Sequence, residues 1–127
     1  MILANEFAEM LTNHKSTLRG YMDEATQYGV RADVDRAALN LTIAWAACRR
    51  GQVDFEAIYR AQDDADEVMD AVVCERWRRV CERELVNALV LEFGERATRE
   101  RIEADTFEPW EIERALASAR AQSGGAA

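Results

Sequence analysis

The residues whose types and spacing are best suited to chemistry are the acids between positions 54 and 70. This segment holds seven carboxylates against one basic side chain, Arg60, which gives it a net charge of −6. The seven are Asp54, Glu56, Asp63, Asp64, Asp66, Glu67 and Asp70. Clustered carboxylates supply the oxygen ligands that Mg²⁺ and Ca²⁺ prefer, but an EF-hand needs alternating ligands and a central glycine, which are absent. We therefore interpret the segment as a solvated helix face with acids near a helix N-terminus.

Two pairs of acids, one of them within this segment, have the spacing of one helical turn. Glu6 and Glu9 form an ExxE pair, and Glu67 and Asp70 form an ExxD pair. These pairs resemble those of the all-α NTP pyrophosphatases, in which paired carboxylates share the metal ions that hold a triphosphate. The resemblance covers four residues at each place, and 57 residues separate the two pairs here, against a much shorter gap in that family. A metal-dependent all-α nucleotide pyrophosphohydrolase is therefore one hypothesis for the function, and it ranks third, after the two given at the end of this section.

The cysteines and the single histidine are the other candidates for chemistry. Cys74 and Cys81 are seven residues apart and share a helix face, so together with Cys48 and His14 they offer the ligands of a Cys₃His zinc site. Their spacing is not that of a zinc finger or knuckle, and free cysteine packs as a small hydrophobe. We expect buried cysteines, no structural zinc and no cofactor. A Ser-His-Asp triad and phosphate-binding glycine loops are also absent, which favours a non-enzymatic protein.

Two surface features bear on partners. The first is a basic cluster that consists of Arg76, Arg78, Arg79 and Arg83. Acidic residues lie among these arginines at ion-pair spacing, so we predict intramolecular pairing and no nucleic-acid patch. Trp110 lies on roughly the opposite helix face from Ile112 and Leu116. It either packs against the first turn of its helix or anchors a partner.

The elements that must position these residues are helices, because apolar residues recur at steps of three and four. The first is predicted from residue 3 to Tyr28, with a kink or close contact at Gly20 and a cap at Gly29. Asp33 or Asp35 is predicted to cap the second, which ends at residues 49–51.

This second helix is apolar nearly all round, so its own chain or a second subunit should cover it. We expect it to be central, with Trp45 in the core.

Asp54 is predicted to cap a short third helix that ends near Gln62, with Val53 and Ile58 forming a hydrophobic staple. A longer helix should start at Asp64 and bend or break after Cys81.

Residues 85–93 are predicted to form a buried helix, with a strand as the less favoured alternative, and Gly94 is predicted to end this element. Residues 95–105 suit an exposed helix or an ordered loop. Thr106 or Glu108 then opens a last helix with Pro109 in its first turn.

The predicted fold class is therefore all-α: a compact bundle of about five to six helices around a central apolar helix at about residues 35–50. We predict one helical domain over residues 1–121 and a disordered tail over residues 122–127.

Composition limits the environment and the partners. The net charge of −8 opposes binding to nucleic acid or anionic membranes. The first residues contain no basic region, so we expect no secretory signal, and the longest uncharged stretch, residues 37–48, is too short to cross a membrane. An odd number of cysteines suits reduced thiols, so we predict a cytoplasmic protein. Fifteen of the 16 basic residues are arginine, which indicates a GC-rich bacterial, archaeal or viral genome.

The leading functional hypothesis is a small, acidic, non-enzymatic protein–protein interaction module, an adaptor or inhibitor, whose partner has a basic surface. The partner-binding candidates are Asp63, Asp64, Asp66, Glu67, Asp70 and Trp110. A homodimer is an alternative arrangement. The second hypothesis is an acidic mimic of nucleic acid that inhibits a host defence or nucleic-acid-binding protein, as anti-CRISPR-like phage proteins do.

Overall fold

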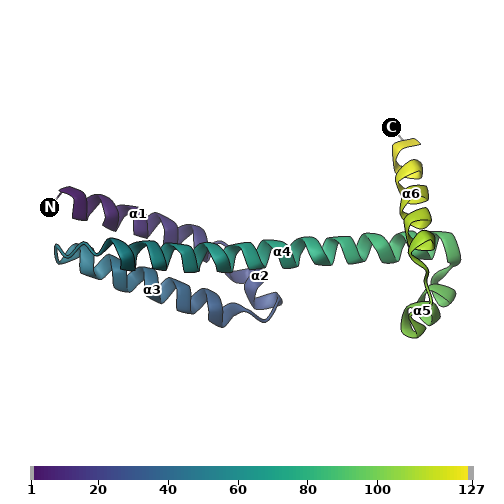
Figure 1. Cartoon of the computed structure of the whole chain (residues 1–127), viewed down its shortest axis with the longest axis horizontal. Coiled ribbons are helices and arrows are strands. Elements are labelled where there is room, and N and C mark those ends of the chain that lie inside the picture. The colour runs from purple at the N-terminus through teal and green to yellow at the C-terminus, as the bar shows by residue number, and fades with distance from the viewer. Residues whose placement is uncertain (1, 126–127) are drawn as a thin grey trace. The chain divides into compact units, whose positions relative to one another are not determined.

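The computed structural model describes residues 2–125, and every regular element in this range is an α-helix (Figure 1). The helices are α1 (Ile2–Arg19), α2 (Met22–Gln27), α3 (Arg31–Arg49), α4 (Phe55–Phe93), α5 (Glu95–Ala104) and α6 (Pro109–Gly125). The all-α prediction and the expected number of helices are confirmed. Residues 85–93, for which a strand was the alternative, are helical.

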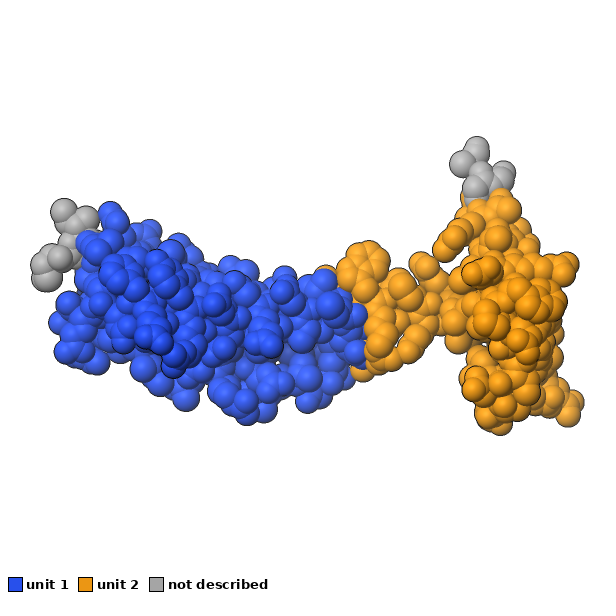
Figure 2. Space-filling model, viewed as in Figure 1, with its two compact units in different colours: residues 1–75 blue, residues 76–127 orange. Residues whose placement is uncertain are grey.

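The chain divides into two compact units, residues 1–75 and residues 76–127 (Figure 2). Helix α4 contributes to both, and each unit has its own cluster of buried apolar side chains. The single domain over residues 1–121 stays a prediction.

In unit 1, residues 1–75, helices α1, α3 and the first part of α4 lie side by side, and α3 runs back along α1 (Figure 1). Each helix turns an apolar face inward. The largest fully buried side chains are Leu11 and Leu18 from α1, Val34 and Leu41 from α3, and Ile58 and Val72 from α4. Short α2 adds Ala25 to the same core. Unit 1 is thus a three-helix bundle with one short connecting helix.

The connection between α1 and α3 follows the prediction in part. The helix is interrupted at Gly20, and Gly29 adopts a φ of +75°. The Val30 N–H donates to the Ala25 carbonyl at 2.8 Å, which is the long hydrogen bond of a glycine-capped helix end. Because this turn leads directly into α3, Val30 stands at the N-cap position without a side-chain cap. The prediction that Asp33 or Asp35 caps the helix is wrong.

Helix α3 is covered on one face and open on the other. Its buried residues are Val34, Ala37, Ala38, Leu41, Ala44 and Cys48. Leu39 and Ile43 are 58% and 60% exposed, and Trp45 is 38% exposed. The expectation that Trp45 lies in the core is wrong. The reason is geometric: α1 and α4 are the long neighbours of α3 in unit 1, and two neighbours cover only part of a helix circumference.

Helix α4 starts as predicted and then continues much further. The Ala57 N–H donates to Asp54 Oδ1 at 3.2 Å, so Asp54 is the N-cap, and Val53 packs against the cluster that contains Ile58. The predicted helix end near Gln62 and the predicted break after Cys81 are wrong, because 39 consecutive residues form one helix. The segment contains no glycine or proline, the residues that most strongly break helices.

Unit 2, residues 76–127, has a small core in which the last turns of α4 meet α6. Ala88, Leu89 and Ala115 are buried, and larger side chains pack around them. These are Leu85, Phe93, Phe107, Ile112, Leu116 and Ala119. Gly94, with a φ of +88°, ends α4 and begins the turn into α5.

The start of α6 is fixed by two acids. The Glu108 N–H donates to Glu111 Oε1 at 3.2 Å, which is one half of a capping box, and Pro109 occupies the first helical position. Glu108, and not Thr106, therefore opens the helix. It extends to Gly125, beyond the predicted domain end at Ala121. Residues 126–127 of the predicted tail lie outside the described residues.

Candidate functional site

Four of the five candidate acids form one row along α4. Asp63, Asp66, Glu67 and Asp70 are exposed, and their spacing of three and four residues places them on one face of the helix. Asp64 is half-buried and turned toward α3, where it lines a groove. The structure therefore brings the predicted acids of unit 1 together on a single element.

Most of these acids have no basic partner among the described residues, unlike several other acids of the surface. Elsewhere, Arg60 pairs with Glu56 at 2.8 Å and Arg99 with Glu95 at 3.2 Å, one helical turn apart. Within residues 2–125, no basic side chain pairs with Asp63, Asp64, Glu67 or Asp70. Asp66 Oδ1 lies 2.9 Å from Nε2 of His14, which joins α1 to α4. The row thus keeps a concentrated negative charge.

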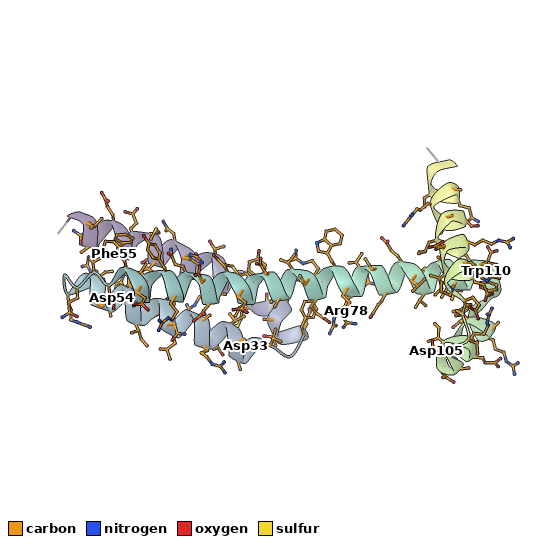
Figure 3. The ribbon with its side chains drawn as sticks, viewed as in Figure 1. Asp33, Asp54, Phe55, Arg78, Asp105 and Trp110 are labelled. Carbon is orange, nitrogen blue, oxygen red and sulfur yellow. The ribbon has the colours of Figure 1, made fainter. Side chains whose placement is uncertain are left out.

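A groove runs between α3 and α4 on the side of unit 1 where Asp64 lies. It consists of two adjoining hollows of about 410 and 360 Å³, and Asn40 and Asp64 line both. Six alanines line the groove: Ala37, Ala44, Ala47, Ala57, Ala61 and Ala71. In Figure 3, Asp33 and Asp54 mark its two ends, since each lines one of the hollows. Exposed Ile43 lies along its wall.

The groove combines apolar surface with an excess of acids. Leu39 lies one helical turn before Ile43 on the same face of α3, so an exposed apolar strip runs beside the alanine-lined hollows. The charged side chains of the walls are Asp33, Asp54, Asp64, Glu67, Arg36 and Arg60. Four of these six are acidic. The groove therefore suits a ligand that is apolar on one side and basic at its edges.

A second uncovered surface of unit 1 contains aromatic rings from α1 and α4. The ring centroids of Phe7 and Phe55 are 5.4 Å apart with an interplanar angle of 74°, and those of Phe55 and Tyr59 are 6.3 Å apart at 25°. Phe55 and Tyr59 are 46% and 53% exposed. Leu3 and Met10, also exposed, stand one turn to either side of Phe7 on α1.

Trp110 is the predicted candidate in unit 2. It lies in the first turn of α6 and is 61% exposed (Figure 3). Of the two predicted roles, this exposure favours a partner anchor over packing against its own helix. Within the Arg cluster, Arg78 donates to Glu82 one turn along α4, as expected.

The candidate metal sites do not assemble. Among the described residues, no three His, Cys, Asp or Glu side chains are grouped so that they could hold a metal ion. Glu6 and Glu9 lie on α1, whereas Glu67 and Asp70 lie on α4.

The cysteines divide between core and surface. Cys48 is buried, and burial raises the pKa of its thiol. Cys74 and Cys81 are exposed, so the expected core packing is confirmed only for Cys48.

The aromatic surface and the α3–α4 groove were not found from the sequence. Phe55 and Tyr59 stand four residues apart at a helix start, which was a signal for a shared face. Spacing along one helix does not reveal which other helix lies beside it, so the contact with Phe7 required the structure.

Comparison with known proteins gives no further constraint: no family model, curated protein or solved structure matches the chain. Of the helices within residues 2–125, none combines the length and the apolar character that a membrane crossing requires.

Proposed function

We propose that this protein is a small acidic interaction module that accepts a helix of a partner protein in the α3–α4 groove, acting as an adaptor or inhibitor and not as an enzyme. The observation that carries the proposal is the exposure of Ile43 on the wall of an alanine-lined groove, with exposed Leu39 one helical turn away on the same face of α3. Exposed apolar strips next to a concave surface are typical of sites where an amphipathic helix binds.

The alanines favour a helix as the ligand. Their short side chains let another backbone approach α3 and α4 closely, so a helix seated there would become the fourth member of the bundle. Leu39 and Ile43 would then be covered, which removes apolar surface from water. Helix α3 is apolar nearly all round, so a bound helix would cover the apolar face that the chain itself leaves exposed.

The charges of unit 1 define the chemistry of the partner. Residues 1–75 hold fourteen acids and seven basic residues, which gives a net charge of −7. Asp64 and Glu67 line the groove, and Asp63 and Asp70 lie beside them on α4. A helix with one apolar face and basic flanks matches both features, so we propose a partner with a basic surface. Electrostatic attraction of this kind accelerates association and weakens as salt increases.

A mimic of nucleic acid is the second candidate. The row of carboxylates on α4 favours it, because three of its four members have no basic partner within the described residues. Asp63, Glu67 and Asp70 are contiguous on α4 and are not neutralised by the chain's own arginines. In that case the partner's basic surface would be one that normally binds phosphates. Displacement of the protein from its partner by DNA or RNA would distinguish this candidate from a plain adaptor.

Affinity purification from the native host with matched variants tests the proposal. Ile43→Ser removes the exposed apolar side chain at the groove, and Leu91→Ser removes one that is equally exposed in unit 2. We expect a basic protein to be retained by the wild type and by Leu91→Ser and lost with Ile43→Ser. The purified partner should then bind Ile43→Ser at least about tenfold more weakly. Equal affinity for the two variants would contradict groove binding.

The proposed location is the cytoplasm. All three cysteines carry free thiols, and two of them, Cys74 and Cys81, are exposed. Exposed thiols persist in the reducing cytosol, whereas secreted proteins generally oxidise them.

A further inference from the structure

The aromatic surface of unit 1 lies beside the carboxylate of Asp63, which has no ion-pair partner within the described residues. Tyr59 and Asp63 are four residues apart on α4, so the carboxylate stands one turn beyond the ring on the same face. Among the same residues, no lysine or arginine lies over the ring of Phe55 or Tyr59. The nearest arginine in sequence, Arg60, is held by Glu56 at 2.8 Å.

Unit 2 shows how two aromatic rings and a carboxylate hold an arginine in this protein. The guanidinium carbon of Arg101 lies 4.2 Å from the ring centroid of Phe107 and 5.3 Å from that of Phe93. The same guanidinium donates to both carboxylate oxygens of Glu111. Two aromatic rings and a carboxylate thus hold one arginine. Unit 1 presents two neighbouring rings and a carboxylate without the arginine.

We propose that Phe55, Tyr59 and Asp63 bind an arginine side chain in a basic peptide segment of a partner protein. The guanidinium would stack on the exposed ring faces, whose π electrons attract cations, while its N–H groups donate to the Asp63 carboxylate. Arginine is preferred to lysine because its charged group is planar and donates along its edge, whereas an ammonium group is compact and does not stack. The negative charge of unit 1 attracts such a segment and repels acidic ones.

This surface is separate from the α3–α4 groove. Phe55 contacts Phe7 of α1, Tyr59 stacks on Phe55, and neither ring lines the groove. The two proposed sites can therefore be tested independently. A partner could use both, with its helix in the groove and a basic segment on the rings, but the arginine site does not depend on the groove.

The test compares fluorescein-labelled oligoarginine and oligolysine peptides of equal length, which differ in stacking but not in charge. Binding to the full chain is measured by fluorescence anisotropy at low ionic strength. The wild type should bind oligoarginine roughly two- to fivefold more tightly than oligolysine. The double variant Phe55→Leu/Tyr59→Leu keeps apolar side chains but removes the rings, and it should lose this preference.

Three controls separate the proposal from its alternatives. Trp77→Leu removes an exposed ring in unit 2, 59% exposed, and should keep the preference, as should Leu91→Ser. Asp63→Asn should weaken the binding of both peptides. Circular dichroism must first show an unchanged helix content for each variant.

Equal affinity of the wild type for the two peptides would overturn the proposal, as would a preference that survives in the double variant. If the double variant instead converts a dimer to a monomer with the preference intact, the rings form a contact between copies of the chain and the arginine site is wrong.

Discussion

Arg101 and Glu111 form a two-point ion pair that joins the end of α5 to the first turn of α6. The guanidinium nitrogens of Arg101 lie 2.7 and 3.0 Å from the two carboxylate oxygens of Glu111, and one of these nitrogens also donates to the Thr106 carbonyl at 3.2 Å. Because the same guanidinium lies against Phe93 and Phe107, this pair orders the loop between the two helices. Such paired, fork-shaped contacts are geometrically specific.

The pair makes the stability of unit 2 dependent on pH. The hydrogen bonds from Arg101, followed by that from the Glu108 N–H, lower the pKa of Glu111. A carboxyl group whose pKa is lower in the folded state stabilises the fold above its unfolded pKa of about 4.3, and this contribution is lost as the pH falls through the folded value. Glu111→Gln should therefore lower the melting temperature at neutral pH and reduce its loss in acid. Glu113→Gln, an exposed neighbour without an ion pair, is the matched control. Identical melting curves for the two variants would contradict this role.

The side chain of Asp54 should contribute measurably to the stability of unit 1. It accepts a hydrogen bond from the Ala57 N–H, one of the free N–H groups at the start of α4. Asp54→Ala should lower the free energy of unfolding by about 1 kcal/mol, whereas Asp54→Ser, which can still cap, should cost about half as much or less. Urea denaturation measures both. A larger loss for serine than for alanine would show that Asp54 acts through something other than capping.

Features set by neighbouring residues were predictable from the sequence. The cap at Asp54, the glycine-ended helices at Gly29 and Gly94 and the proline start of α6 depend on backbone conformations within a few residues. The acidic row was predictable for the same reason, because helical spacing alone places Asp63 and Asp70 on one face.

Features set by distant parts of the chain were not predictable. The shift of the apolar face of α4 after Cys81 suggested a break, but it marks a change of packing neighbours. Ile58 and Val72 belong to the buried cluster of unit 1, whereas Ala88 and Leu89 belong to that of unit 2. The exposure of Ile43 and the contact between Phe7 and Phe55 likewise depend on which helices lie side by side. Periodicity reports a helix's apolar faces but not what covers them.

Thr98 offers a stabilising substitution in unit 2. Its side chain is 1% exposed, and its hydroxyl has no hydrogen-bond partner among the described residues. A buried hydroxyl that has lost its contact with water and gained no partner lowers stability. Thr98→Val replaces the hydroxyl by a methyl group of similar shape, so it should raise the free energy of unfolding by about 1 kcal/mol. Thr98→Ser, which keeps the hydroxyl and removes the methyl group, should lower it. If valine destabilises the protein, the hydroxyl is bonded in solution.

The two faces of α3 should respond differently to truncation. Leu41 is fully buried between α1 and α4, so Leu41→Ala should lower the free energy of unfolding by roughly 2 to 5 kcal/mol. Ile43, two residues further on, is exposed, so Ile43→Ala should change the free energy of unfolding by no more than about 0.5 kcal/mol. Trp45→Ala should fall between these values, because about three-fifths of its surface is covered.

Thermal denaturation of these three variants, at equal protein concentration, checks the one-sided burial of α3. The ranking matters more than the individual values, because the three residues share one helix and differ mainly in cover. If Ile43→Ala destabilises the isolated protein as much as Leu41→Ala, a second copy of the chain already covers the open face in solution. Sedimentation would then reveal a dimer, and the groove would not be free to accept a partner's helix. If Ile43→Ala leaves the melting temperature unchanged, the open face of α3 does not contribute to the stability of the isolated protein. This is the result expected for a surface that binds a partner.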